Sequence, residues 1–216
     1  MNGRTRIAKQ PGTSARRRSA EQVLPPRVRG DILAAATKVF SERGYHGASM
    51  KDVADAAGVQ KASLYHHVTR KEDLLFAIHE QMIDELIGLT IPAVSSSRPP
   101  SEKVREIIVI AMEFIARHRD GVTVFLKERD TLTGARWDAI VAKRDLYEKM
   151  VESVIAEGAR TGAFIHARSD IAARGILGMV NWAYTWFDPA GELSPVEVAE
   201  TFATIAVEGL ETSTPA

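Results

Sequence analysis

Apolar residues recur at three- and four-residue spacing along most of the chain, which is the pattern of amphipathic helices. In the first such segment Ile32, Ala36, Val39 and Phe40 fall on one face. The pattern predicts nine helices, at residues 27–43, 50–57, 60–67, 70–89, 101–119, 122–129, 136–161, 170–186 and 195–210. No segment alternates apolar and polar residues for long enough to form a strand, so we expect an all-α fold.

Short polar motifs mark where the early helices begin and end. Ser49 and Asp52 have the spacing of a capping box, in which the two side chains satisfy free N–H groups of the first helical turn. Thr69 and Glu72 repeat this spacing before the fourth helix. The second and third helices are both short and are separated by a tight turn at Gly58, which indicates a helix-turn-helix.

Composition divides the chain into three parts. Residues 1–25 are rich in Arg, Ser, Gly and Pro without a hydrophobic period, so we expect a disordered arm there. The helices form a small part at 26–70, which contains the helix-turn-helix, and a larger part at 71–211, with the fourth helix linking them. The Ser- and Pro-rich stretch 92–100 predicts a loop after the fourth helix.

The charge distribution indicates a nucleic-acid partner although the total charge does not. The chain has 28 Lys and Arg against 28 Asp and Glu, a formal net charge of zero. Residues 1–30 contain eight Lys or Arg and a single acid, Glu21, which leaves a local charge of +7. A basic end on an otherwise acidic chain is typical of an arm that contacts nucleic acid.

The sequence lacks residues that several classes of function require. The chain has no Cys, no Gly-rich phosphate loop and no Glu-x-x-His pair, and the adjacent His66 and His67 point to different sides of a helix. We therefore expect no enzyme activity, no metal site and no cofactor. We find no signal-peptide pattern and no window of about 18 apolar residues, so we expect a cytoplasmic protein without a membrane partner.

The residues around the predicted helix-turn-helix resemble one family closely. The match covers about 45 residues, 32–75, through the motifs FSERGY (40–45), ASMKDVA (48–54), AGVQKASLYHH (57–67) and KEDL (71–74). In these motifs the chain is similar to the tetracycline-repressor (TetR) family of bacterial transcriptional regulators. Val68 stands where the family usually has Phe, which we expect to alter packing rather than DNA contact. The remainder resembles the family only in the number and order of helices.

The resemblance implies a repressor that binds operator DNA and is released by a small molecule. In a helix-turn-helix the second helix enters the major groove. The residues predicted to read bases are therefore Gln60, Lys61, Ser63, Tyr65 and His66. The residues predicted to hold phosphates are Ser49, Lys51 and Lys71. The alternatives are solvated surface charge for the two lysines and core packing for Tyr65. The basic arm either follows the minor groove or, as we favour, raises nonspecific affinity.

One short reading helix supplies little specificity, so we expect a homodimer on a pseudo-palindromic site. The expected interface lies on the last two helices, at Ile176, Met179, Val180, Ala199, Phe202, Ile205, Ala206 and Gly209. The alternative is that these residues form only the core of the chain itself. Residues 71–211 thus form a ligand-binding and dimerisation domain. Its expected pocket is lined by Met82, Phe114, Phe125, Trp137, Arg144, Tyr147 and Trp182.

Arg144 is the most informative of these pocket residues. It lies in an otherwise apolar stripe of the seventh helix, where a lone charge is costly. Its partner is either a carboxylate of the preceding helix, Glu128 or Asp130, or an anionic group on the ligand. Together with Tyr147 and the segment 186–191, Arg144 also resembles the TetR branch that regulates lipid and sterol catabolism. That branch senses acyl-coenzyme A thioesters, so the resemblance implies a fatty-acyl or sterol-derived thioester as inducer.

Two other functions fit parts of the sequence. One is a drug-responsive repressor of an efflux pump, whose pockets often carry acidic groups, so that the basic Arg144 argues against it. The other is an architectural DNA-binding protein without a ligand. Such a protein has no need of the large second domain with its aromatic side chains.

Overall fold

The computed structural model describes residues 30–128, 130–165 and 168–211. These residues form nine α-helices and one 3₁₀ turn, and the one bridge between extended residues in them joins Phe164 to Glu211. The helices are α2 (Gly30–Arg43), α3 (Met50–Ala56), α4 (Lys61–His67), α5 (Lys71–Ser95), α6 (Pro100–Arg117), α7 (Arg119–Lys127), α8 (Gly134–Thr161), α9 (Ser169–Trp182) and α10 (Pro195–Leu210). The predicted all-α fold and number of helices are confirmed. The predicted basic arm, 1–25, lies outside the described residues.

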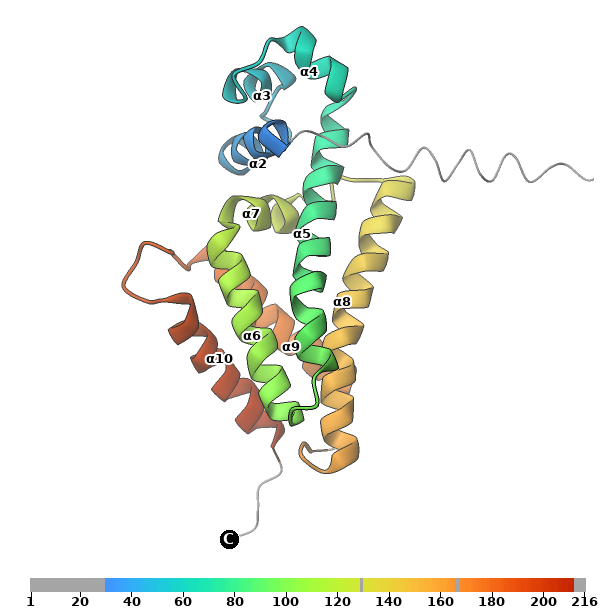
Figure 1. Cartoon of the computed structure of the whole chain (residues 1–216), viewed down its shortest axis with the longest axis vertical. Helices are drawn as coiled ribbons and strands as arrows, with labels where there is room; N and C mark the ends of the chain where they lie inside the picture. The colour runs from blue at the N-terminus through green and yellow to red at the C-terminus, as the bar shows by residue number, and fades with distance from the viewer. Residues whose placement is uncertain (1–29, 129, 166–167, 212–216) are drawn as a thin grey trace, which may run out of the picture.

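Helices α2, α3 and α4 form a small head at one end of the molecule (Figure 1). Phe40, Val53 and Leu64, one from each helix, are almost completely buried in its core. The predicted capping box begins α3, because the Ser49 Oγ accepts from the Asp52 backbone N while the Asp52 carboxylate accepts from the Ser49 backbone N. The head is thus stabilised by the capping of α3 and by one apolar core that its three helices share.

Helix α5 runs from the head to the opposite end of the molecule (Figure 1). The carboxylate of Asp73 accepts from the Arg70 backbone N at 2.8 Å and caps its first turn. The capping residue is therefore Asp73 and not Glu72, one residue later than the sequence indicated. Leu74 and Leu75 follow immediately and are fully buried, which fixes α5 against the head.

The end of α5 differs from the prediction. The helix was expected to stop near Leu89, before a loop at 92–100, but it continues through Pro92 to Ser95. A proline inside a helix removes one backbone hydrogen bond and crowds the preceding turn. The last turn forms nevertheless because Thr90 and Ala93 are buried in the core, so that tertiary packing offsets the local cost.

Helices α6 to α10 complete a larger helical bundle around α5. Helix α10 packs chiefly on α6, while α8 packs on α5 and α9. The apolar layer between them includes Ile107, Met112 and Ile140, all fully buried. The end of α8 is packed so closely that a Cβ atom on Gly158 would lie 2.1 Å from the Phe164 ring, and only glycine fits there.

Helix α9 is shorter than predicted. It was expected to extend to 186, but regular α-helix ends at Trp182 and a 3₁₀ turn, η1 (Ala183–Thr185), follows. The Thr185 hydroxyl donates to the Trp182 carbonyl at 2.7 Å, and the Phe187 backbone N donates to the Ala183 carbonyl at 2.8 Å. The backbone thus changes from α-helix to a 3₁₀ turn before Pro189, a residue that cannot continue a helix, and then turns toward α10.

Candidate DNA-reading surface and effector cavity

The outer face of α4 lies at the far end of the head (Figure 1). Four of the five predicted base-reading residues are exposed there: Gln60, Lys61, Tyr65 and His66. Ser63 is half-buried, and Leu64 is fully buried and holds the helix to the core. With 46% of its surface exposed, Tyr65 is not a core residue. The four exposed side chains form one polar and aromatic surface that can meet base edges.

The first turn of α3 borders this surface. Ser49 and Lys51, two of the three predicted phosphate-holding residues, are both exposed. The Lys51 Nζ lies 2.8 Å from the Asp55 carboxylate, and this hydrogen bond raises the pKa of Lys51. Lys51 can therefore meet a phosphate only by exchanging or sharing its intramolecular partner.

Lys71, the third predicted phosphate-holding residue, has a different place. Its Nζ donates to the backbone carbonyl oxygens of Tyr45, at 2.6 Å, and Ala48, at 2.7 Å. The same atom lies 4.3 Å from the centroid of the Tyr45 ring, and burial lowers the pKa of Lys71. The prediction for Lys71, and its alternative as solvated charge, are both corrected: this cation fastens α5 to the turn between α2 and α3.

A cavity of about 460 Å³ lies among α5, α7, α8 and α9. Its volume falls within the usual range of small-molecule sites. Its apolar walls include Ile83, Leu86, Phe125, Trp137, Val141 and Leu177, and its polar side chains are Arg144, Asp145, Tyr147, Glu148, Arg174 and Asn181. The Arg174 Nε and the Glu148 carboxylate are joined at 2.7 Å, so two of these charges offset each other.

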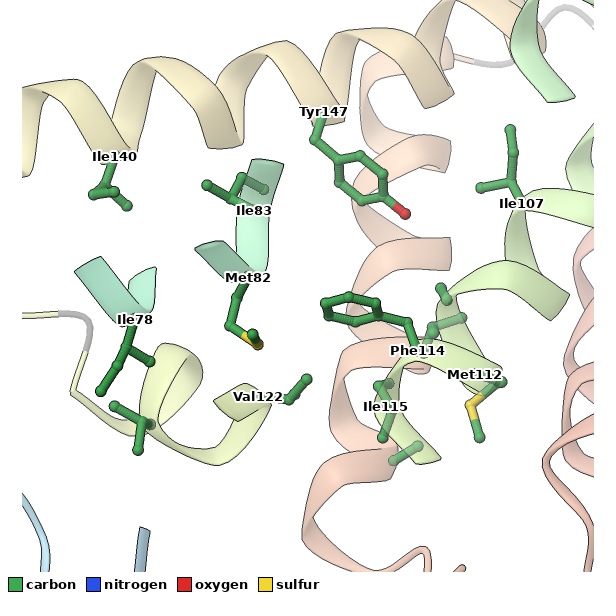
Figure 2. Close-up of a cluster of buried hydrophobic side chains, with 14 of the residues drawn as sticks. Ile78, Met82, Ile83, Ile107, Met112, Phe114, Ile115, Val122, Ile140 and Tyr147 are labelled. Atoms are coloured by element: carbon green, nitrogen blue, oxygen red, sulfur yellow. The ribbon is translucent and has the colours of Figure 1, made fainter. Parts of the chain in front are cut away.

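A second, inner chamber of about 30 Å³ continues from this cavity. The two chambers share seven lining residues, among them Phe125 and Tyr147. Figure 2 shows the side chains of Met82, Phe114 and Val122 directed toward one another on the inner side of Tyr147. The site is thus apolar at its inner end and polar at its outer end.

Six of the seven predicted pocket residues line one of these chambers. Met82 and Phe114 line the inner chamber, Trp137 and Arg144 line the outer one, and Phe125 and Tyr147 line both. The prediction for Trp182 is wrong, because this side chain is 65% exposed and lines neither chamber. The charged residues Glu148 and Arg174 were missed, since helical periodicity does not show which polar residue faces a cavity.

Arg144 lies in the wall of the outer chamber. Its guanidinium carbon lies 5.2 Å from the centroid of the Phe125 ring. The centroid of the His79 ring lies 5.2 Å from the same Phe125 centroid. Glu128, one of the two carboxylates expected to pair with Arg144, accepts from the backbone N of Tyr45 at 2.9 Å. Arg144 thus belongs to a stack of side chains that joins α8, α7 and α5.

Two side chains lie where the larger bundle meets the head, one contacting the turn after α2 and the other the start of α5. Glu128, which ends α7, accepts from the Tyr45 backbone N in the turn after α2. Arg136, in the first turn of α8, forms an ion pair with Asp73 and lies 3.8 Å from Glu72. Because Asp73 also caps α5, these contacts fix the start of α5 and the preceding turn together.

Both contacts are adjacent to the cavity in the chain. Glu128 follows the cavity residue Phe125 by three positions, and Arg136 immediately precedes the cavity residue Trp137. Short stretches of chain therefore connect the cavity wall to the contacts at the head and at the start of α5.

Known proteins share both the motif and the architecture. Residues 32–78 match the family described as bacterial regulatory proteins, tetR family, and residues 97–210 match the tetracyclin repressor-like C-terminal domain. The chain belongs to the TetR family. Among curated relatives, the HTH-type transcriptional repressor KstR2 of Mycobacterium tuberculosis is 27% identical over 184 residues, which cover 84% of this chain and 92% of KstR2.

Two solved structures extend the comparison to three dimensions. PfmR, a TetR-family transcriptional regulator from Thermus thermophilus, has a TM-score of 0.78 and 29% identity over 84% of this chain and 99% of PfmR. AibR, solved with isovaleryl coenzyme A and operator DNA, has a TM-score of 0.75 and 31% identity over 81% of this chain and 95% of AibR. The protein is accordingly a DNA-binding transcriptional regulator of the TetR family, a class that binds operator DNA.

The last two helices of this TetR-family chain expose an apolar face. Ile171, Trp182 and Ile205 are each more than half exposed. A Cβ atom at Gly175 or Gly178 would meet nothing within 4 Å, so this side of α9 is open. Large apolar side chains gathered on one face are typical of an interaction surface.

The predicted interface residues divide between this face and the core. Ile205 and Gly209 are exposed, and Met179 and Phe202 are half-buried. Four others are buried within the chain, and for them the core alternative holds: Ile176, Val180, Ala199 and Ala206. These side chains pack against other helices of the same chain: α10 packs chiefly on α6, and α9 packs chiefly on α8.

The described residues contain no helix long and apolar enough to cross a membrane, and no group of three His, Asp or Glu side chains that could hold a metal ion. The histidines have separate surroundings. His79 is buried in α5, the His118 Nε2 lies 2.9 Å from the Glu85 carboxylate, and His66 is exposed on α4.

Proposed function

We propose that the protein is a homodimeric repressor that leaves a palindromic operator when a small molecule enters the cavity. The observation that carries this proposal is the position of the cavity. Its lining residues Phe125 and Trp137 lie close in the chain to Glu128, which contacts the turn after α2, and to Arg136, which pairs with Asp73 at the start of α5. A ligand acts here by binding one arrangement of the head more tightly than the other. We propose 26–70 as the DNA-binding domain and 71–211 as the ligand-binding and dimerisation domain, with α5 continuous between them.

We propose a coenzyme A thioester as the inducer, from a fatty or a sterol-derived acid, in the control of lipid catabolism. The apolar walls of the outer chamber, which continue into the inner one, suit an acyl group, and Arg144 in the same chamber suits polar or anionic groups. The relative AibR is described with isovaleryl coenzyme A, and a solved structure of KstR2 is described as a ketosteroid transcriptional regulator. These names support the class of ligand and leave the acyl group open.

We propose the exposed face of α9 and α10 as the dimer interface. The exposed Ile171, Trp182 and Ile205 supply apolar area, and Gly175 allows a partner helix to approach closely. Two copies related by a two-fold axis present two α4 helices to successive major grooves. The predicted base-reading and phosphate-holding residues of α3 and α4 then act twice on one operator.

The first test is a thermal-shift panel on the full chain, with fatty-acyl and sterol-derived thioesters, free coenzyme A, free acids and cationic aromatic drugs. A true ligand at about 100 times its dissociation constant raises the free energy of unfolding by about 2.7 kcal/mol. Stabilisation by thioesters, and not by free coenzyme A or free acids, supports the proposal. Stabilisation by drugs alone favours the efflux-pump alternative.

The second test measures DNA affinity with and without the stabilising ligand, on an operator selected from a random duplex library. Release predicts a weaker affinity in the presence of ligand. Because AibR is described with both a thioester and operator DNA bound, the two affinities must be measured and not inferred. Equal affinities with every compound of the panel would support the architectural alternative.

A further inference from the structure

A groove of about 480 Å³ lies between the head and the larger bundle. Helix α2 of the head forms one side of it, and the corner where α6 leads into α7, residues 117–121, forms the other. Figure 1 shows α7 directly beside α2, and the two helices pack on each other. Gln81 and Met82 of α5 complete the lining. The groove therefore touches both parts of the molecule at the place where they meet.

The side chains of this groove carry a net positive charge. Three cations and one carboxylate line it, which leaves a charge of +2 with His118 neutral: Lys38, Arg117, Arg119 and Asp120. Arg119 is paired with Asp188 at 3.3 Å. Lys38 and Arg117 are exposed, and neither forms an ion pair within the part of the chain that the structure describes. One available cation thus comes from the head and one from the larger bundle.

The two chambers of the effector cavity have no such excess of charge. In the outer chamber two cations are matched by two carboxylates: Arg144 and Arg174 by Asp145 and Glu148. The inner chamber is lined by no charged side chain. Of these three spaces, the groove is therefore the one that favours a group with several negative charges.

The donors of the groove suit phosphate oxygens. The Arg117 guanidinium can donate two parallel hydrogen bonds to one phosphate, and the Lys38 ammonium adds a second positive charge. The Gln81 amide, which is exposed on α5, can donate as well. Without an anion, Lys38 and Arg117 bring like charges to one groove, which disfavours the contact between α2 and α6. A phosphate between them reverses the sign of this interaction.

We propose that this groove binds a phosphate or diphosphate group, which then holds α2 of the head against the corner between α6 and α7. Because the bound anion favours one position of the head, its binding changes the affinity for operator DNA. The lining and charge of the groove, on which this anion site stands, are independent of the proposed function.

The phosphates can belong to the effector or to a separate ligand. Met82 lines both the groove and the inner chamber, so its side chain lies between the two spaces. It packs so closely that a Cβ atom on Gly121 would lie 2.4 Å from the Met82 Sδ. A methionine side chain has three rotatable bonds, so a change of rotamer can join the groove to the chamber. A coenzyme A thioester could then place its acyl group inside and its phosphates in the groove, and this attribution rests on the proposed function.

The first test is calorimetric titration with inorganic pyrophosphate at constant ionic strength. The double variant Lys38→Gln with Arg117→Gln is expected to bind pyrophosphate at least about tenfold more weakly than the wild type. Both side chains are exposed, so thermal unfolding without ligand is expected to match the wild type. Lys127→Gln, at an exposed cation of α7 that lines neither the groove nor the chambers, is the control and keeps the wild-type affinity. Equal affinities of the wild type and the double variant overturn the inference.

Two thioesters identify the source of the phosphates. Isovaleryl-coenzyme A carries phosphates, whereas isovaleryl-pantetheine has the same acyl group and thioester without them. If the effector supplies the phosphates, the double variant binds isovaleryl-coenzyme A more weakly and isovaleryl-pantetheine unchanged, and pyrophosphate competes with isovaleryl-coenzyme A. If a separate ligand supplies them, the double variant loses affinity for pyrophosphate alone, and pyrophosphate and thioester bind together.

Operator binding supplies a second readout. At equal ionic strength, pyrophosphate is expected to change the operator affinity of the wild type and not that of the double variant. An equal change in both overturns the inference. The result also separates this site from the proposed function. Pyrophosphate binding that the double variant loses, without binding of any thioester, overturns the thioester proposal alone. Thioester binding that the double variant keeps, without pyrophosphate binding by the wild type, overturns the anion site alone.

Discussion

His79 is buried in α5, with its Nδ1 3.0 Å from the Leu75 carbonyl oxygen. Burial, helped by the nearby Arg144 and opposed by the Leu75 carbonyl and Glu128, lowers the pKa of His79 to about 4. In the unfolded chain this histidine has its ordinary pKa near 6.5, so between pH 6.5 and 4 it is protonated in the unfolded chain and neutral in the folded one. The free energy of unfolding is therefore highest above pH 6.5 and falls by roughly 3 kcal/mol as the pH drops to 4.

This pH dependence is tested by urea denaturation of the wild type and His79→Gln between pH 4 and 7. The difference between the two curves isolates His79 from the carboxylates that also titrate in this range. His66→Gln, at an exposed histidine, is the control and is expected to follow the wild type. Parallel curves for wild type and His79→Gln would show that His79 does not account for the slope.

For single residues, the sequence showed which side chains are unusual better than it showed what those side chains contact. Arg144 stood out because a charge interrupts an apolar stripe, and it does line the cavity. Lys71 looked like a phosphate-holding residue because of its place in the motif, yet its Nζ binds two backbone carbonyl oxygens. Sequence spacing gives the face of a helix, and only the folded chain gives the atoms opposite it.

A nearly buried ion pair joins the first turn of α8 to the first turn of α5. Arg136 and Asp73 are both nearly buried, so removing the cation in Arg136→Gln leaves a carboxylate without its charged partner. We expect a loss of roughly 3 kcal/mol in the free energy of unfolding, measured by urea denaturation. Lys51→Gln removes the exposed pair with Asp55 and is the control, with no measurable loss expected.

The two short head helices have separable roles in DNA binding. Lys61 lies on the exposed face of α4, so Lys61→Ala is expected to reduce discrimination at one operator base pair, by about 1–3 kcal/mol. Lys51→Ala, on α3, is expected to weaken binding to all sequences equally and to lower the salt slope by about one. Competition binding against single-base operator variants, repeated at several salt concentrations, separates the two outcomes. Equal effects on all sequences in both variants would remove Lys61 from base reading.

Helix ends were predicted well where a local motif sets them and poorly where packing does. Ser49 with Asp52 begins α3, as the capping pattern indicated. Pro92 did not end α5, because Thr90 and Ala93 on either side of it are buried in the core. Capping is a contact within one turn, so the sequence contains it, whereas the burial of a helix end depends on distant elements.

For the whole molecule, the exposed apolar face of α9 and α10 predicts self-association. Sedimentation of the wild type is expected to give twice the chain mass of 23.7 kDa. Ile205→Glu, at a residue 59% exposed, places a charge in the proposed interface and is expected to yield monomers that remain folded. Leu146→Glu, at a residue 51% exposed on α8, is the control and should remain dimeric. If both variants remain dimeric, the interface lies elsewhere on the surface.

The sequence by itself determined the all-α fold, the helix-turn-helix and the family, because these depend on short-range periodicity, capping and a dense motif. Only the tertiary structure decided which apolar residues line a cavity, which form the core and which remain exposed. Val180 and Trp182 illustrate the reason: they lie two residues apart on one apolar helix, one buried and the other 65% exposed. Their difference comes from the helices packed around α9, which no local pattern encodes.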